Sequence, residues 1–204
     1  TAHLEGFYYK PRIDKRILSE CTEGLIAQSA CLHGEIPRLI QVGRMDKAVE
    51  AARSYQSMFG EGNFFLEVQN NGIAIQETVN RALLEMSKDL SIPLVATNDC
   101  HYLTRDDARA HDVLLCIQTG KTVQETKRLK FQTDQLYFKS PEEMKRDFSD
   151  FPNAVANSIE IARRCNLELD LSSYHFPRFR SSQDKDGSKG EEKGRSPLNV
   201  EGLF

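Results

Sequence analysis

The sequence lacks the cysteine pattern of a disulfide-rich protein. It has five cysteines, an odd number, and no two of them form a CxxC pair. They are Cys21, Cys31, Cys100, Cys116 and Cys165. This usage favours free thiols in a reducing compartment over a disulfide framework, so we expect a cytoplasmic location.

Long apolar runs and an excess of positive charge are also missing. No run approaches the roughly 20 apolar residues of a membrane-spanning helix, and residues 1–6 show no basic segment followed by an apolar one, as a signal peptide would. We therefore expect no membrane partner. The 27 Lys and Arg against 30 Asp and Glu give a net charge of −3, so any nucleic-acid contact would need a local site. Because the sequence starts at Thr1 without an initiator methionine, we expect a piece of a longer chain.

Strands and helices are expected to alternate through the first hundred residues. Short runs rich in β-formers span 24–29 and 63–68, and a third apolar run follows Pro93. Apolar residues spaced by three and four predict helices over 46–59 and 75–90. The strands are apolar throughout and their connections are short. This order predicts an α/β fold with a parallel sheet or barrel.

The second half is expected to be mostly helical. The sequence predicts a helix that ends at Gly120, another from a capping box at Ser140 to Phe148, and a third over 153–165. Short strands are expected over 136–139 and, as a further option, 167–171. Residues 180–195 are charged and rich in Gly and Ser with no apolar residue, which predicts a flexible linker, and 196–204 are too few to assign.

Polar side chains follow the expected strands where each strand ends. Cys31, Glu67, and the pair Asp99 and His101 should meet on one face, because sites in such folds collect at the C-terminal strand ends. In an extended chain, Asp99 and His101 would point the same way and could bind zinc or manganese. The alternative is an Asn-Asp turn followed by a surface histidine. Glu67 is better explained as a strand-end charge or a hydrogen-bond partner of a ligand.

Several segments carry a resemblance to a known family. They are HLEGFYYKPRID (3–14), EGLIA (23–27) with CL (31–32) and GEIP (34–37), VATNDCHYL (95–103), AHDVLLCIQTGK (110–121), YFKSPEEM (137–144) and NSIEIA (157–162). Together they resemble the bacterial DNA polymerase III alpha subunit, which is a replicative C-family polymerase. The resemblance covers roughly 3–179 in the right order. It implies that 1–110 are the C-terminal half of a PHP domain, a partial distorted βα barrel. Residues 111–179 would be a mostly helical connector toward the polymerase palm.

The resemblance also implies a set of metal ligands. Cys31, Asp99 and His101 fall on the last three ligand positions of the family's PHP metal cluster, which would hold divalent ions such as zinc or manganese. The family's earlier ligands, including a His-x-His motif, would lie before Thr1. The aspartates that bind magnesium in the polymerase site would lie after Phe204. This chain alone is therefore expected to be inactive, and no catalytic residue or general base can be named.

The function that the resemblance implies is DNA-directed DNA synthesis by the parent protein, with DNA and other replicase subunits as partners. The PHP domain could add a metal-dependent 3′–5′ exonuclease or phosphoesterase activity. Two alternatives stay open. One is a non-catalytic scaffold that docks a separate proofreading subunit. The other is a free-standing PHP phosphoesterase, against which the polymerase-like connector argues.

Overall fold

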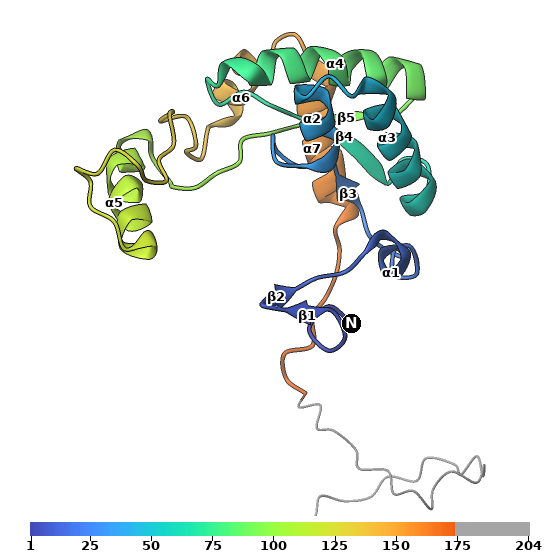
Figure 1. Ribbon diagram of the computed structural model, residues 1–204. Helices are drawn as coiled ribbons and strands as arrows, with labels where there is room; N and C mark the ends of the chain where they lie inside the picture. Colours follow the sequence, from blue (N-terminus) through green and yellow to red (C-terminus); the bar gives the residue numbers. More distant parts are fainter. Residues whose placement is uncertain (174–204) are drawn as a thin grey trace, which may run out of the picture. The chain divides into compact units, whose positions relative to one another are not determined.

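The computed structural model describes residues 1–173 (Figure 1). Residues 1–166 form one compact unit, and a second unit starts at Leu167. The strand expected over 167–171 is wrong. The carboxylate of Asp170 instead accepts hydrogen bonds from the backbone N–H of Ser172 and from the hydroxyls of Ser172 and Ser173, and such local bonds compete with strand pairing. The predicted linker over 180–195 lies outside the described residues.

A parallel sheet forms the centre of the first unit. Strands β3 (Ala27–Gln28), β4 (Phe64–Gln69) and β5 (Leu94–Thr97) lie in the order β3-β4-β5. Every residue of the central β4 except Glu67 is buried, as expected for a strand covered on both faces. The predicted α/β class is confirmed, and the open sheet is consistent with a partial PHP-type barrel.

Strand β3 is shorter than the six residues expected over 24–29. Gly24 and Ala30 both have positive φ angles, +73° and +63°, which turn the backbone away from an extended path on either side of the strand. Only Ala27 and Gln28 pair with β4, opposite Phe64 and Phe65.

Helices α2 (Glu35–Gln41), α3 (Met45–Phe59) and α4 (Ala74–Leu90) supply much of the core beside the sheet. The two longer helices confirm the predictions over 46–59 and 75–90. On α4, the four apolar residues at helical spacing are all buried; they are Val79, Leu83, Met86 and Leu90. Helix α2 was not predicted from the sequence. Pro37 stands in its first turn, where a missing N–H costs little.

The second half of the chain packs against the same core. Helices α6 (Pro141–Asp147) and α7 (Pro152–Arg164) follow the predicted positions, and Ser140 and Glu143 form the predicted capping box. Phe148 and Ala154 belong to the core cluster that contains β4 and β5, and the Asn157 amide donates to the Leu94 carbonyl over 2.7 Å. The domain boundary at 110 stays a prediction, because both sides of it lie in one compact unit.

The strand expected over 136–139 is reduced to one parallel bridge between Tyr137 and Tyr102. The carbonyl of Leu136 instead accepts from the backbone N–H of His101, and the carbonyl of Tyr137 accepts from the side chain of Asn98. Irregular bonds of this kind replace a ladder and join the segment to the chain that follows β5.

The remaining elements lie at the start of the chain and after β5. Strands β1 (Phe7–Tyr8) and β2 (Lys10–Pro11) form a small hairpin, and α1 (Lys15–Ser19) begins with a cap in which Asp14 accepts from the Ile17 N–H. A short 3-10 turn, η1 (Arg105–Asp107), leads into α5 (Ala108–Thr119), which Gly120 ends in a left-handed conformation as predicted. Across residues 1–173, no helix has the length and apolar content needed to cross a membrane.

Candidate metal centre

The C-terminal edge of the sheet carries the predicted ligand residues. Cys31 follows β3, while Asp99 and His101 follow β5. Because β4 lies between these two strands, Cys31 stands on one side of the edge and the Asp99–His101 pair on the other. Within residues 1–173, no three His, Cys, Asp or Glu side chains gather closely enough to hold an ion. The three residues therefore share an edge of the sheet without forming a complete centre.

Asp99 and His101 are held together by a local turn rather than by an extended strand. Asp99 has a φ of +45°, so the expectation of an extended chain at this point is wrong and the alternative of an Asn-Asp turn is closer. The Nδ1 atom of His101 lies 2.7 Å from the backbone oxygen of Asp99 and 3.9 Å from its Oδ1. A carbonyl oxygen only accepts, so this contact requires a proton on Nδ1, and a neutral ring then has its lone pair on Nε2. Metal-binding histidines commonly donate their second N–H in this way, so His101 fits a ligand that binds through Nε2.

Glu67 lies between the two sides, on β4. Its Oε1 accepts from the Gln69 amide over 2.9 Å and from the Thr97 hydroxyl, and its backbone N–H donates to the Ser29 hydroxyl. Glu67 and Cys31 line the same small cavity. This is the hydrogen-bonded strand-end carboxylate that the sequence favoured over a direct ligand.

A buried amide network fixes the position from which Asp99 leaves the sheet. The side-chain amide of Asn71, which is 1% exposed, donates to both the Oδ1 and the backbone oxygen of Asn98 at 3.0 Å. Gln76 exchanges two bonds of 2.8 Å with Asn71. Asn98 in turn donates to the carbonyls of Gln135 and Tyr137. Since Asn98 directly precedes Asp99, the network fixes the start of the turn that carries Asp99 and His101. Sequence reasoning missed it.

We expect Asn71→Ala to lower the free energy of unfolding by about 1–3 kcal/mol, because it leaves buried polar groups of Gln76 and Asn98 without partners. Urea denaturation of the 204-residue chain measures this. The control is Asn166→Ala at an exposed position, for which no loss is expected. Equal stability of both variants would contradict the proposed importance of the network.

A hydrogen-bonded ion pair holds residues 121–135 against α5. Arg128, whose side chain is 5% exposed, donates two bonds of 2.6 and 2.8 Å to the Asp112 carboxylate. This hydrogen-bonded ion pair holds the pKa of Asp112 below its usual range. A carboxylate with a lowered pKa stabilises the folded state above its unfolded pKa of about 3.9, and the contribution is lost as the pH falls through the folded value.

We therefore expect Asp112→Asn to lower stability at pH 7. The difference from the unchanged protein should begin to shrink only below about pH 4 and should vanish once the pH lies below the lowered pKa of Asp112. Thermal unfolding of both proteins across this range measures the effect. Asp89→Asn, at an exposed position on α4, serves as the control and should show no such dependence. A difference at Asp112 that persists in acid would exclude the ion pair as its cause.

Comparison with known proteins gives matches of two consistent kinds, to a domain family and to individual proteins. Residues 1–71 match the PHP domain. DNA polymerase III subunit alpha of Treponema pallidum is 44% identical over 188 residues, covering 90% of this chain and 16% of the relative. The proteins of the same name from Borreliella burgdorferi and Thermus aquaticus are 46% and 44% identical, over 81% and 87% of this chain and 14% and 15% of their own lengths.

The chain resembles a segment of bacterial DNA polymerase III subunit alpha. The resemblance predicted from the sequence is thereby confirmed, together with the presence of PHP sequence in the first part of the chain. The chain spans about one sixth of the length of these polymerase relatives.

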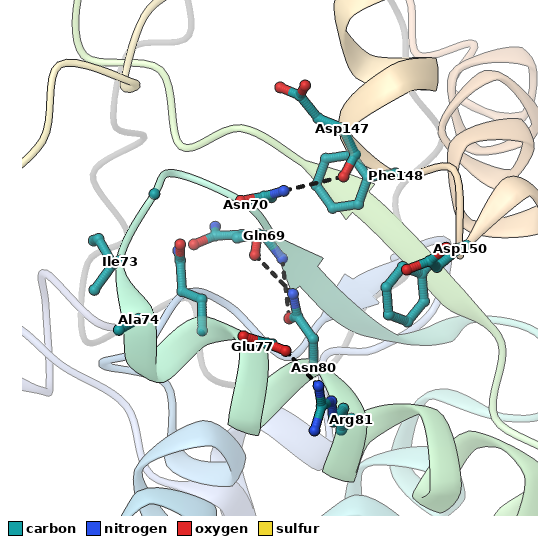
Figure 2. Close-up of a pocket in the computed structure, with 13 residues that line it drawn as sticks. Gln69, Asn70, Ile73, Ala74, Glu77, Asn80, Arg81, Asp147, Phe148 and Asp150 are labelled. Atoms are coloured by element: carbon teal, nitrogen blue, oxygen red, sulfur yellow. Dashed lines mark hydrogen bonds and ion pairs between the residues drawn. The ribbon is translucent and has the colours of Figure 1, made fainter.

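A cavity of about 440 Å³ lies between the end of β4, the start of α4 and the α6–α7 connection of this polymerase-like chain (Figure 2). Its polar side chains bind one another: Asn80 donates to the Gln69 carbonyl, Arg81 pairs with Glu77, and Asn70 donates to the Asp147 carbonyl. The Asp147 carboxylate is bound by the buried Lys139, whose ammonium lies 2.8 Å away. These contacts support a structural role, in which the cavity wall joins α6 to the sheet edge.

Proposed function

We propose that this chain is a segment of a bacterial replicative DNA polymerase whose reaction is DNA-directed DNA synthesis. The observation that carries the proposal is the identity of 37–46% over most of the chain to proteins named DNA polymerase III subunit alpha. The magnesium site of that reaction would lie in the remaining five sixths of such a protein. DNA and other replicase subunits are the partners. Five free thiols agree with a location in the bacterial cytoplasm.

Within this polymerase, Cys31, Asp99 and His101 would hold part of a divalent metal centre of zinc or manganese. Thiolate, carboxylate and imidazole are the donors that such ions take. The N–H of His101 Nδ1 donates to the Asp99 carbonyl, which fixes the ring and leaves Nε2 for an ion. The other ligands would come from elsewhere in the intact protein. Bound divalent ions would activate a water molecule and neutralise charge on a phosphoryl group.

The reaction that this centre would support is hydrolysis of the phosphodiester at the 3′ end of a DNA strand. The Asn71–Asn98 amides would set the turn that carries the ligands Asp99 and His101, and Thr97 and Gln69 would orient the Glu67 carboxylate at the same edge of the sheet. No general base is assigned. The 204-residue chain by itself should not hydrolyse DNA, because it supplies only part of the ligand set, and it should not polymerise DNA, because the aspartates of the polymerase site would lie outside it.

The test is 3′-end hydrolysis of a labelled single strand by the intact polymerase with Mn²⁺ or Zn²⁺. His101→Ala should reduce the rate by at least about 100-fold, because a metal ligand is removed from the site that activates water. His3→Ala, at an exposed position near the start of the chain, is the matched control and should leave the rate unchanged. An unchanged rate of 3′-end hydrolysis in His101→Ala would contradict the catalytic proposal.

A structural scaffold that docks a proofreading subunit is the second candidate. The observation in its favour is the mutual pairing of polar groups around the cavity of Figure 2, which favours rigidity over chemistry. Under this alternative, His101→Ala would leave hydrolysis by the assembled replicase unchanged. A free-standing phosphoesterase is less well supported, because the similarity to polymerase relatives extends over 90% of the chain.

A further inference from the structure

Three aromatic rings gather with that of His101 in one cluster. The His101 ring centroid lies 4.9 Å from that of Phe131 and 5.4 Å from that of His111. His111 is itself 5.4 Å from Tyr102 and 5.6 Å from Phe131. These rings come from the loop after β5, from α5 and from the segment that precedes Thr133. The role of His101 as a metal ligand does not explain why three further rings accompany it.

A cavity of about 280 Å³ opens along this cluster and is here called the aromatic pocket. Tyr102, His111, Phe131 and Leu115 supply its aromatic and apolar lining, and Arg109 and Lys130 stand at its exposed rim. Its volume is near the lower end of the range for ligand sites, which suits one small ring system rather than a large ligand.

The charges around the aromatic pocket favour an anion. Asp112 also lines it, but the carboxylate is bound in bidentate fashion by Arg128 and its charge is balanced. Arg109 and Lys130 make no ion pair with any residue in the described part of the chain. Two free cations beside an aromatic wall are the combination that binds a base and its phosphate in single-stranded nucleic acid.

The wall of the aromatic pocket that carries Phe131 is held in place by hydrogen bonds before any ligand binds. On one side Arg128 is held by Asp112, and on the other Asp134 accepts from Arg105 over 2.7 Å. Between Phe131 and Asp134, the Thr133 hydroxyl donates to the Asn71 carbonyl over 2.5 Å. Anchors on both sides of Phe131 reduce the ordering that binding would otherwise require.

We propose that the aromatic pocket binds the last nucleotide of a single DNA strand, with its base against Phe131 and Tyr102 and its phosphate paired with Lys130 and Arg109. The proposal deepens the proposed function, on which it rests for the identity of the ligand. It places the strand end one ring away from His101.

The test is fluorescence anisotropy of an eight-nucleotide dA strand with a 5′ label, titrated with the full 204-residue chain in excess EDTA. Phe131→Ala and Phe131→Leu should each weaken binding about tenfold, since stacking of one base is lost. Phe131→Tyr should retain affinity, because it keeps a ring of similar shape. Phe138→Ala, an exposed aromatic outside the pocket, is the matched control. Far-ultraviolet circular dichroism checks that each variant is folded.

Two further arms identify the ligand. A strand whose 3′-terminal nucleotide is abasic should bind the unchanged protein about tenfold more weakly, and Phe131→Ala should then have no additional effect. Lys130→Gln should reduce the slope of the logarithm of the binding constant against the logarithm of the salt concentration, by about the contribution of one phosphate contact. Lys127→Gln should leave this slope unchanged. Free dAMP that binds in a Phe131-dependent way while the strand does not would overturn the strand-end assignment. Equal strand binding by Phe131→Leu and the unchanged protein would overturn the pocket itself.

The outcome is separable from that of the proposed function, because the chelator removes any metal. Phe131-dependent binding without nuclease activity in the intact polymerase would contradict the hydrolytic proposal and leave the aromatic pocket supported. Nuclease activity without Phe131-dependent binding would do the reverse.

Discussion

Replacing Phe148 with alanine is expected to lower the free energy of unfolding by about 3–5 kcal/mol, the usual loss for a large aromatic side chain removed from a core. Phe148 is 1% exposed and belongs to the cluster that contains Leu66 of β4 and Leu83 of α4. It lies between α6 and α7, so it joins the predicted connector to the sheet. Urea denaturation of the full chain measures the loss, provided that the dependence of the unfolding free energy on urea concentration is the same in both proteins.

The control for this prediction is the same substitution at Phe138, which is 73% exposed. Its effect should stay within about 0.5 kcal/mol, as is usual for surface positions. A loss at Phe148 no larger than that at Phe138 would show that residues beyond 110 do not share the core of the sheet. A large loss would show that the connector folds with the first hundred residues.

The second large effect concerns metal affinity. In the intact protein, His101→Ala should weaken the binding of Zn²⁺ or Mn²⁺ by more than about 100-fold, beyond the 10–100-fold typical of groups that only support a ligand. The reason is that Nδ1 of His101 is bound to the Asp99 carbonyl, so Nε2 is the ring atom whose lone pair is available to an ion. Competition with a chromophoric chelator measures the change, and His3→Ala is again the control. Unaltered affinity in His101→Ala would exclude this histidine as a ligand.

Much of the fold could be predicted because its determinants are local. The apolar faces of α3 and α4 repeat every three to four residues, and the capping box at Ser140 marks the start of α6. Helix α2 was missed because it has seven residues, too few to show a period. The strands expected over 136–139 and 167–171 failed for a different reason. Strand pairing depends on partners far away in the chain. Over 167–171 local hydrogen bonds of Asp170 replaced pairing, and over 136–139 irregular bonds to Asn98 and His101 did so.

The candidate site was predicted in outline for a similar reason. Parallel strands deliver their ends to one edge, so the sequence order was enough to bring Cys31, Glu67 and Asp99 there. The left-handed turn at Asp99 and the proton on His101 depend on contacts with the backbone that no pattern displays. The amide network joins Asn71 to Asn98 and Gln135, which are 27 and 64 positions away. Such pairs emerge only when the chain is folded.

The most direct test is elemental analysis of the purified intact protein and of three single variants, Cys31→Ser, Asp99→Asn and His101→Ala. If these residues belong to one metal centre, the unchanged protein should contain zinc or manganese in stoichiometric amount, and each variant should contain clearly less. Protein without bound metal, or full metal content in all three variants, would contradict the account.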